Sequence, residues 1–246
     1  MKAWFEEHFQ EDYLKVYDHR DEEKAANELA YLMTYLPLER GMKAVDLCCG
    51  NGRHSRFLAR KGIHVTAVDL SPALLKKAVD LTSGLPVQYM RADIRDVALK
   101  TEYDAAFNLF TSFGYFTDDA ENELVFVRAA EALKENGWFF FDYLNPSYVE
   151  RRLVPRDITE KEGLTVTQER YIEAGFINKK ITIEESGSQR EYRERVKMYS
   201  PEALRNMLTR NGFRVQYVFG DYDGTPYEQQ ESPRQILICQ KQSKGK

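Results

Sequence analysis

Hydrophobic residues along this chain follow two spacings, one typical of amphipathic helices and one typical of buried strands. Between residues 21 and 36, apolar side chains recur every three or four positions until Pro37, which predicts a helix. Over the next hundred residues, short apolar runs alternate with helical segments. The predicted strands are 44–48, 65–68, 87–90, 104–110 and 138–141, and the predicted helices are 53–61, 71–79 and 119–134. This alternation predicts an α/β fold with a doubly wound, mostly parallel sheet.

The pattern changes after Pro146. Residues 164–199 alternate polar and apolar positions between turn residues, as antiparallel strands do. A helix at 200–211 and two strands, 213–219 and 235–240, are predicted to follow. The connection between these two strands is too short for a helical crossover, so we expect them to pair antiparallel.

These elements indicate one main domain with an insertion. We assign residues 1–150 and 200–246 to the main domain and residues 151–199 to a β-rich antiparallel insertion. With 246 residues, of which 43% are hydrophobic, the chain is long enough to bury a substantial core. The number of subunits stays open between a monomer and a homodimer.

Charge and hydropathy exclude several classes of partner. The net charge is −4, so we expect no nucleic-acid partner. No apolar run approaches the ~20 residues that span a bilayer, and the acidic first thirty residues lack the core of a signal peptide. We therefore expect a cytoplasmic protein that makes no membrane contact.

Cysteine and histidine residues do not predict a metal site. Three cysteines, two of them adjacent at Cys48 and Cys49, suit a reducing compartment. Together with His54 they would supply at most three ligands from one loop, so we expect no metal. The other histidines are isolated and predicted to lie on the surface or in strands: His8, His19 and His64.

The strongest local signal lies where the first strand meets the next helix, in VDLCCGNGR. Gly50 and Gly52 allow the backbone to approach a ligand, and the helix beyond offers free N–H groups. A dinucleotide fingerprint would need a third glycine at position 55, where the sequence has Ser55. Asp69 ends the second strand, 19 residues after Gly50 (69 − 50), where a carboxylate can accept both ribose hydroxyls. Both NAD and adenosyl ligands satisfy this geometry.

Two further segments distinguish these ligands. Asp93, in RADIRD after the third strand, can reach an adenine amino group, and FNLFTSFGYF follows the fourth strand. The four motifs VDLCCGNGR, AVDLS, RADIRD and FNLFTSFGY, in this order, resemble class I S-adenosylmethionine (SAM)-dependent methyltransferases. They are similar in particular to the small-molecule enzymes related to sugar N-methyltransferases. The resemblance covers residues 40–145 and implies a seven-stranded sheet of order 3-2-1-4-5-7-6.

The resemblance also implies roles for individual residues. Asp69 would hold the ribose of SAM. The methionine part would lie against Asp46 and the backbone of Cys48, Cys49, Gly50, Asn51 and Gly52. The adenine would contact Leu70, Asp93 and Ile94, and the sulfonium and amino-acid end would contact Asn108 and Leu109. In the lid segment DYLKVYDHR, Tyr17 and Arg20 would meet the SAM carboxylate. Cys48 departs from the family, which has a glycine there, so we expect a slightly different loop path.

The chemistry implied by the resemblance is methyl transfer to a small-molecule acceptor by in-line displacement. The protein then acts mainly by positioning. Tyr115 is the first candidate for a general base and Tyr17 the second, and Phe110 and Phe113 are candidates for cation–π contact with the sulfonium. The alternatives are a nicotinamide-dependent oxidoreductase and a non-catalytic sensor that binds SAM or a nucleotide.

The remaining predictions concern the acceptor side. The insertion is predicted to cap that side, while its charged stretch QREYRERVK is predicted to be a solvated face, with a substrate cover or dimer contact as alternatives. Asp221 and Arg234 are further candidates there. Aromatic residues, 13% of the chain, concentrate in the fifth strand, the N-terminal lid and the loop after the fourth strand. The last two groups point to an aromatic acceptor site.

Overall fold

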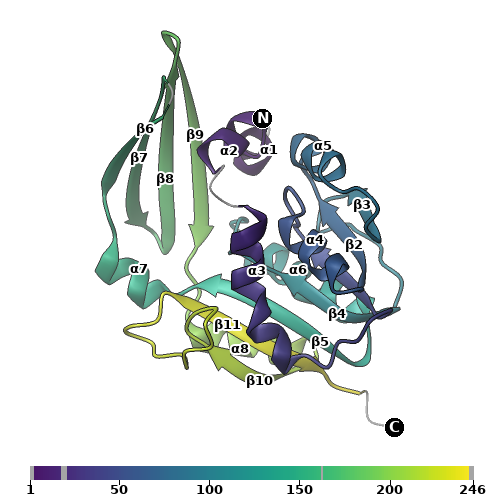
Figure 1. Ribbon diagram of the computed structural model, residues 1–246. Coiled ribbons are helices and arrows are strands. Elements are labelled where there is room, and N and C mark those ends of the chain that lie inside the picture. The colour runs from purple at the N-terminus through teal and green to yellow at the C-terminus, as the bar shows by residue number, and fades with distance from the viewer. Residues whose placement is uncertain (1–2, 18–20, 162, 244–246) are drawn as a thin grey trace.

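A seven-stranded sheet organises the fold. The computed structural model describes residues 3–17, 21–161 and 163–243. The strands lie in the order β10-β11-β5-β4-β1-β2-β3 (Figure 1). Their bounds are β1 (Lys43–Leu47), β2 (His64–Asp69), β3 (Val87–Arg91), β4 (Tyr103–Asn108), β5 (Leu133–Leu144), β10 (Phe213–Phe219) and β11 (Arg234–Lys241). Strands β1 to β5 pair in parallel, and β11 and β10 continue the sheet antiparallel. The predicted order 3-2-1-4-5-7-6 is confirmed.

Helices cover both faces of this sheet. One face is packed by α3 (Glu22–Ala30), α4 (Arg53–Arg60) and α5 (Pro72–Asp80). The other face is packed by α6 (Asp119–Ala132) and α8 (Pro201–Arg210). Because successive residues of a strand point to opposite faces, both helical layers need apolar partners from the same strands. This explains the continuous apolar run of β5.

The β5 phenylalanines show this double burial. Phe139, Phe140 and Phe141 are fully buried. Phe139 and Phe141 pack against Phe126 of α6, whereas Phe140 lies on the opposite face and stacks on Phe107 of β4. The strand therefore joins the two halves of the core.

Two elements differ from their predicted bounds by five or more residues. The helix predicted at 21–36 ends at Ala30 and continues as the 3₁₀ helix η1 (Leu32–Tyr35). Here the Thr34 hydroxyl donates to the Tyr31 carbonyl, and Pro37 cannot extend the helical ladder. β5 begins at Leu133, five residues before the predicted position 138 (138 − 133), because Leu133 already pairs with Tyr103 before a register shift.

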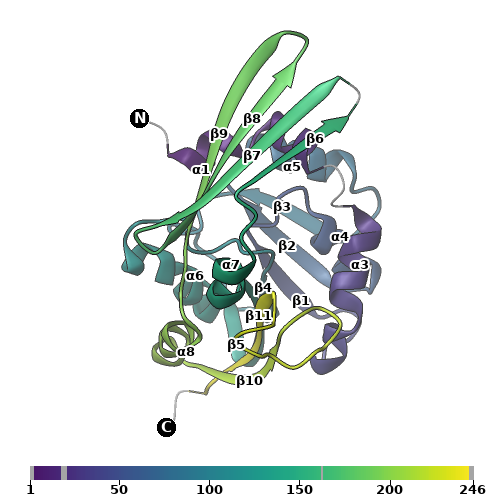
Figure 2. The ribbon, with the colours of Figure 1, turned by 90° about the vertical axis from the view of Figure 1, so that its left-hand side faces the viewer.

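The insertion forms a second, separate sheet of four antiparallel strands (Figure 2). The strands are β6 (Arg156–Lys161), β7 (Leu164–Glu173), β8 (Phe176–Glu185) and β9 (Ser188–Lys197), preceded by α7 (Pro146–Arg152). The antiparallel strands predicted at 164–199 are observed. β6 and α7 were not predicted, because the residues of β6 are mostly exposed and lack an apolar alternation.

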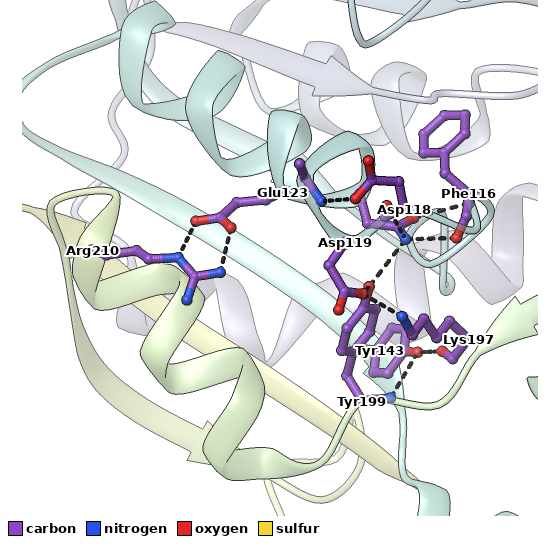
Figure 3. Close-up of polar contacts among 10 residues, drawn as sticks. Phe116, Asp118, Asp119, Glu123, Tyr143, Lys197, Tyr199 and Arg210 are labelled. Atoms are coloured by element: carbon purple, nitrogen blue, oxygen red, sulfur yellow. Dashed lines mark hydrogen bonds and ion pairs between the residues drawn. The ribbon is translucent and has the colours of Figure 1, made fainter. Parts of the chain in front are cut away.

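The end of β9 is fastened to the main domain by a polar network (Figure 3). Asp119, the first residue of α6, accepts hydrogen bonds from Lys197 and from the Tyr199 hydroxyl. The Tyr143 hydroxyl of β5 donates to the Lys197 carbonyl. Nearby, Glu123 of α6 pairs with Arg210 of α8. These contacts fix where the insertion leaves the main domain.

Two short N-terminal helices bridge the two sheets. In Figure 1, α1 (Trp4–His8) and α2 (Glu11–Val16) lie between β9 and α5. Asp12 accepts hydrogen bonds from Arg190 and Tyr192 of β9, both at 2.6 Å. On the other side, the Ser71 hydroxyl donates to the Phe9 carbonyl at 2.5 Å. Among the described residues, no helix is long and apolar enough to cross a membrane.

The buried aromatic cluster leads to a stability prediction. Replacing Phe126, which is fully buried, by alanine should lower the free energy of unfolding by about 3–5 kcal/mol, because a large cavity opens beside Phe113, Phe139 and Phe141. Urea denaturation measures this loss. Val79→Ala, at a side chain that is 55% exposed, is the control and should change stability by less than about 0.5 kcal/mol. Equal effects of the two substitutions would contradict the assigned core.

Candidate functional site

A cavity of about 900 Å³ lies at the carboxyl ends of the parallel strands. Its walls come from the loops after β1, β2, β3 and β4, from α1 and α2, and from strands β7, β8 and β9 of the insertion. Strand ends that are distant in the chain meet here because parallel strands share one carboxyl edge. The cavity therefore joins the main sheet, the N-terminal helices and the insertion.

The loop after β1 turns sharply on left-handed residues. Gly50 and Gly52 have φ angles of +58° and +74°, and Gly52 is the N-cap of α4. A Cβ at Gly52 would lie 2.3 Å from the Tyr89 hydroxyl, so a side chain at this position would force the Tyr89 ring to move. Cys48 also has a positive φ, +65°, which is uncommon for a residue with a Cβ. The cysteine thus adopts a conformation that glycine adopts more easily.

Asp46, on β1, is a buried carboxylate that lines the cavity. The Ser55 hydroxyl donates to its Oδ2 at 2.5 Å. Burial raises the pKa of Asp46 to about 6, although this hydrogen bond acts in the opposite direction. Ser55, which breaks the dinucleotide glycine pattern, therefore holds the carboxylate in place.

Asp69 connects the end of β2 to the loop after β1. Its two oxygens accept hydrogen bonds from the Gly50 N–H at 2.7 Å and the Ser71 N–H at 2.8 Å. Burial raises the pKa of Asp69, while these backbone donors oppose the shift. Each carboxylate oxygen has a second lone pair, so the group can accept further hydrogen bonds from the cavity that it lines.

Asp93 follows β3 and is held in one orientation by Arg95. The guanidinium donates to both carboxylate oxygens, at 3.0 and 2.7 Å. These hydrogen bonds lower the pKa of Asp93 below its ordinary value. Ile94 and Leu70 line the cavity beside it.

The loop after β4 contains two consecutive left-handed residues, Phe110 at φ +59° and Thr111 at φ +62°. The Phe110 N–H donates to the Asp142 carboxylate at 2.7 Å, and the Thr111 N–H donates to the Asp142 carbonyl at 3.1 Å. Neither residue is a glycine, so the left-handed conformations strain the backbone of the loop. The two hydrogen bonds to Asp142 offset the energetic cost of this strain.

Asn108 lies beneath this loop. It is fully buried, and its side-chain amide donates to the Leu47 and Ser112 carbonyls. The structure thus brings most of the predicted SAM-contacting residues to one cavity, with the exceptions of Asn108, Gly50 and Gly52, which do not reach its surface. The residues that do line it are Tyr17, Asp46, Cys48, Cys49, Asn51, Asp69, Leu70, Asp93, Ile94 and Leu109.

The two tyrosines considered as general bases have different surroundings. The Tyr17 hydroxyl donates to Glu194 at 2.8 Å and also contacts Lys179. Tyr115 is packed between Trp4 and Phe9, and burial raises its pKa well above the ordinary value. Tyr115 is therefore a neutral phenol at physiological pH, which favours hydrogen-bond donation over proton abstraction. Arg20 lies outside the described residues.

Phe113, one of the two candidates for cation–π contact with the sulfonium, does not line the cavity. The ring is 1% exposed and stacks on Phe126 at 4.8 Å within the core. Phe110, in contrast, lines the cavity. The left-handed conformations of Phe110 and Thr111 come between these two phenylalanines, and sequence spacing does not reveal them.

His8 was expected on the surface or in a strand, and this is wrong. It is 2% exposed on α1, with Nε2 2.7 Å from Glu194 Oε1 of β9. Glu194 therefore does not belong to a solvated face: burial acts to raise its pKa, but Lys179, His8 and Tyr17 hold the pKa well below its ordinary value. His64 lies at the exposed start of β2, in agreement with the prediction. His19 lies outside the described residues.

One further polar group surrounds Arg234. Arg234, the first residue of β11, lines the cavity and donates to Asp142, which also accepts from the Tyr222 hydroxyl. Asp221, considered beside Arg234, is not among the residues that line the cavity. The only signal for this cluster was its position near the last two strands.

Part of this chain is similar to proteins of known family. Residues 44–137 match the family model of a methyltransferase domain. The chain is 34% identical over 119 residues to a ubiquinone biosynthesis O-methyltransferase of Xylella fastidiosa. The matched region covers 48% of this chain and 47% of that protein. A protein of the same name from Chromobacterium violaceum is 33% identical over 107 residues, covering 43% and 45%. The chain spans about half the length of these curated relatives.

Solved structures share the fold over nearly the whole chain. A SAM-dependent methyltransferase from Clostridium acetobutylicum superposes with a TM-score of 0.81 at 19% identity, covering 94% of this chain and 96% of that one. The sugar N-methyltransferase KedS8 from a Streptoalloteichus species gives a TM-score of 0.71 at 20% identity, covering 94% and 92%. At such identities these likenesses establish the fold.

The left-handed conformation of Cys48 leads to a second prediction. Cys48→Gly should be at least as stable as the wild type, whereas Cys48→Val should lose about 2 kcal/mol, because β-branched residues tolerate a positive φ poorly. Urea denaturation of both variants measures the difference. Neighbouring Cys49 is not among the positive-φ residues and serves as the control. There the order should reverse, with Cys49→Gly more destabilising than Cys49→Val. If valine and glycine are equally stable at position 48, the strain assignment is refuted.

Proposed function

We propose that this chain is a SAM-dependent methyltransferase, which transfers a methyl group from SAM to a small-molecule acceptor; the match of residues 44–137 to a methyltransferase domain and the shared fold support this. One observation carries the proposal. Three carboxylates from successive strand ends, Asp46, Asp69 and Asp93, line a single cavity beside a glycine loop. This arrangement suits an adenosyl ligand with a cationic amino-acid end.

The residues present fit SAM along its whole length. Asp46 is a buried carboxylate facing the cavity, which suits the ligand's ammonium group. The remaining lone pairs of Asp69 suit the ribose hydroxyls, and Asp93 with Leu70 and Ile94 suits the adenine. The backbone from Cys48 to Gly52 would follow the methionine part, with Asn108 supporting the loop from below.

Bound SAM supplies the activated methyl group. The work of this chain is then to hold the acceptor in line with the methyl–sulfur bond and to exclude water. The N-terminal segment lines the cavity with Trp4, Phe9 and Tyr17 and would help to exclude water. Tyr115 would donate a hydrogen bond to the acceptor, and Phe110 would present its ring to the sulfonium.

The main domain and the insertion would divide these tasks. Residues 1–150 and 200–246 would bind SAM, and residues 151–199 would cover the acceptor. Ile177, Lys179, Glu194 and Val196 of the insertion line the cavity, which supports this division. A nicotinamide ligand is disfavoured because Ser55, in place of a third glycine, is committed to Asp46.

Ligand-dependent unfolding tests the proposal. SAM or S-adenosylhomocysteine at ~100 times its Kd should stabilise the protein by ~2.7 kcal/mol, a Tm increase of roughly 5–11 °C, whereas NAD should give no shift. Asp69→Asn should weaken both adenosyl ligands about tenfold or more, and Asp80→Asn, an exposed aspartate paired with Lys76, is the matched control. A shift with NAD alone would sink the proposal. Methyl transfer from labelled SAM to amine, hydroxyl and carboxylate panels then identifies the acceptor.

The raised pKa of Asp46 predicts pH-dependent SAM binding. The unliganded carboxyl has a pKa of about 6, and an ammonium group beside it would lower this value. Below pH 6 the carboxyl must release a proton on binding, so SAM affinity should fall up to tenfold per pH unit as pH decreases. Calorimetry between pH 5 and 8 measures this fall. In Asp46→Asn the affinity should be lower at pH 8 and nearly independent of pH.

A further inference from the structure

Arg234 lines the same cavity as the three aspartates but comes from β11. It begins β11 and pairs in register with Leu144, the last residue of β5. Both residues line the cavity. The proposed SAM site makes no use of this arginine.

Two nitrogens of the Arg234 guanidinium hold it in place. Nε donates to the Asp142 carboxylate, and Nη2 donates to the Thr111 hydroxyl at 2.8 Å. Nη1 has no hydrogen-bond partner among the described residues. By contrast, both terminal nitrogens of Arg170, another arginine in the cavity wall, are engaged, by Asp157 and Gln168. Arg234 therefore keeps one donor edge available in a fixed orientation.

The surroundings keep this guanidinium charged. Burial acts to lower the pKa of Arg234, but the attraction of the Asp142 carboxylate is the stronger effect. The pKa of Arg234 is therefore held above its ordinary value. The guanidinium lies over the Phe110 ring at 5.2 Å, and the guanidinium of Arg53 lies 4.6 Å from the same ring. Two positive groups thus flank one aromatic ring of the cavity wall.

We propose that the acceptor carries a carboxylate and that Arg234 binds it through Nη1 and the remaining N–H of Nη2. The inference rests on the proposed function, because it concerns the acceptor of that reaction. The planar edge of a guanidinium matches the two oxygens of a carboxylate, whereas a single ammonium group does not. Aromatic rings of Phe110 and Tyr115 line the same cavity and would contact the body of such an acid.

A purely structural role for Arg234 makes a different prediction. Asp142 holds the left-handed residues Phe110 and Thr111, and Arg234 could serve only to neutralise Asp142. In that case carboxylates and their neutral amides would bind equally well. The distinction can therefore be measured on the wild-type protein, without substitution.

The experiment uses the full chain saturated with S-adenosylhomocysteine, whose binding is verified by calorimetry in the same samples. Saturation-transfer NMR compares benzoate, benzamide and phenyl phosphate. Benzoate should bind at least about tenfold more tightly than benzamide. Equal binding of the two, or no binding of benzoate, overturns the proposal, and stronger binding of phenyl phosphate overturns the choice of carboxylate. Failure of S-adenosylhomocysteine to bind would instead count against the proposed function.

Variants assign the effect to the residue. Arg234→Gln and Arg234→Lys should each weaken benzoate about tenfold or more while S-adenosylhomocysteine affinity stays within twofold, since lysine keeps the charge but not the two-donor edge. Arg210→Gln, which removes a guanidinium that also pairs with a carboxylate (Glu123) but does not line the cavity, is the matched control and should leave benzoate binding unchanged. Retention of benzoate binding in both Arg234 variants would refute the assignment, and Thr111→Val, which removes only the Nη2 partner, should give a partial loss.

Discussion

The hydrogen bonds of Asp69 fix the geometry on which the cavity depends. One carboxylate oxygen holds the Gly50 N–H, and so sets the loop after β1, while the other holds the Ser71 N–H at the start of α5. Ser71 in turn caps α5 through the Leu74 N–H and donates to the Phe9 carbonyl in the segment between α1 and α2. The Asp69 side chain thus positions the loop after β1 and the start of α5 directly, and the N-terminal segment through Ser71.

The order of the strands and the positions at their carboxyl ends could be predicted from the sequence, because both depend on local patterns. Apolar runs mark buried strands, and Asp46, Asp69 and Asp93 come on or just after such runs. These residues do meet at one edge, as parallel pairing requires. Their roles toward SAM stay predictions until binding is measured.

Contacts between distant parts of the chain could not be predicted in this way. His8 and Glu194 are 186 positions apart (194 − 8), and Asp142 meets Arg234 across 92 positions. Each pairing depends on the register between elements, and neither residue carries a local signal. The position of Phe113 could not be predicted either, although only short-range structure is involved. The backbone conformation of residues 110–111 decides which aromatic ring faces the cavity.

The insertion contributes to the cavity through one face of a regular sheet. Arg170, Lys179 and Glu194 lie directly opposite one another on β7, β8 and β9, and Ile177 and Val196 form the next pair two residues along. Side chains between these positions point to the other face of the sheet. Substitutions at alternate positions of three strands would therefore reshape this wall without touching the loops of the main domain. The pleat of a single sheet thus separates the insertion residues that face the cavity from those that face away from it.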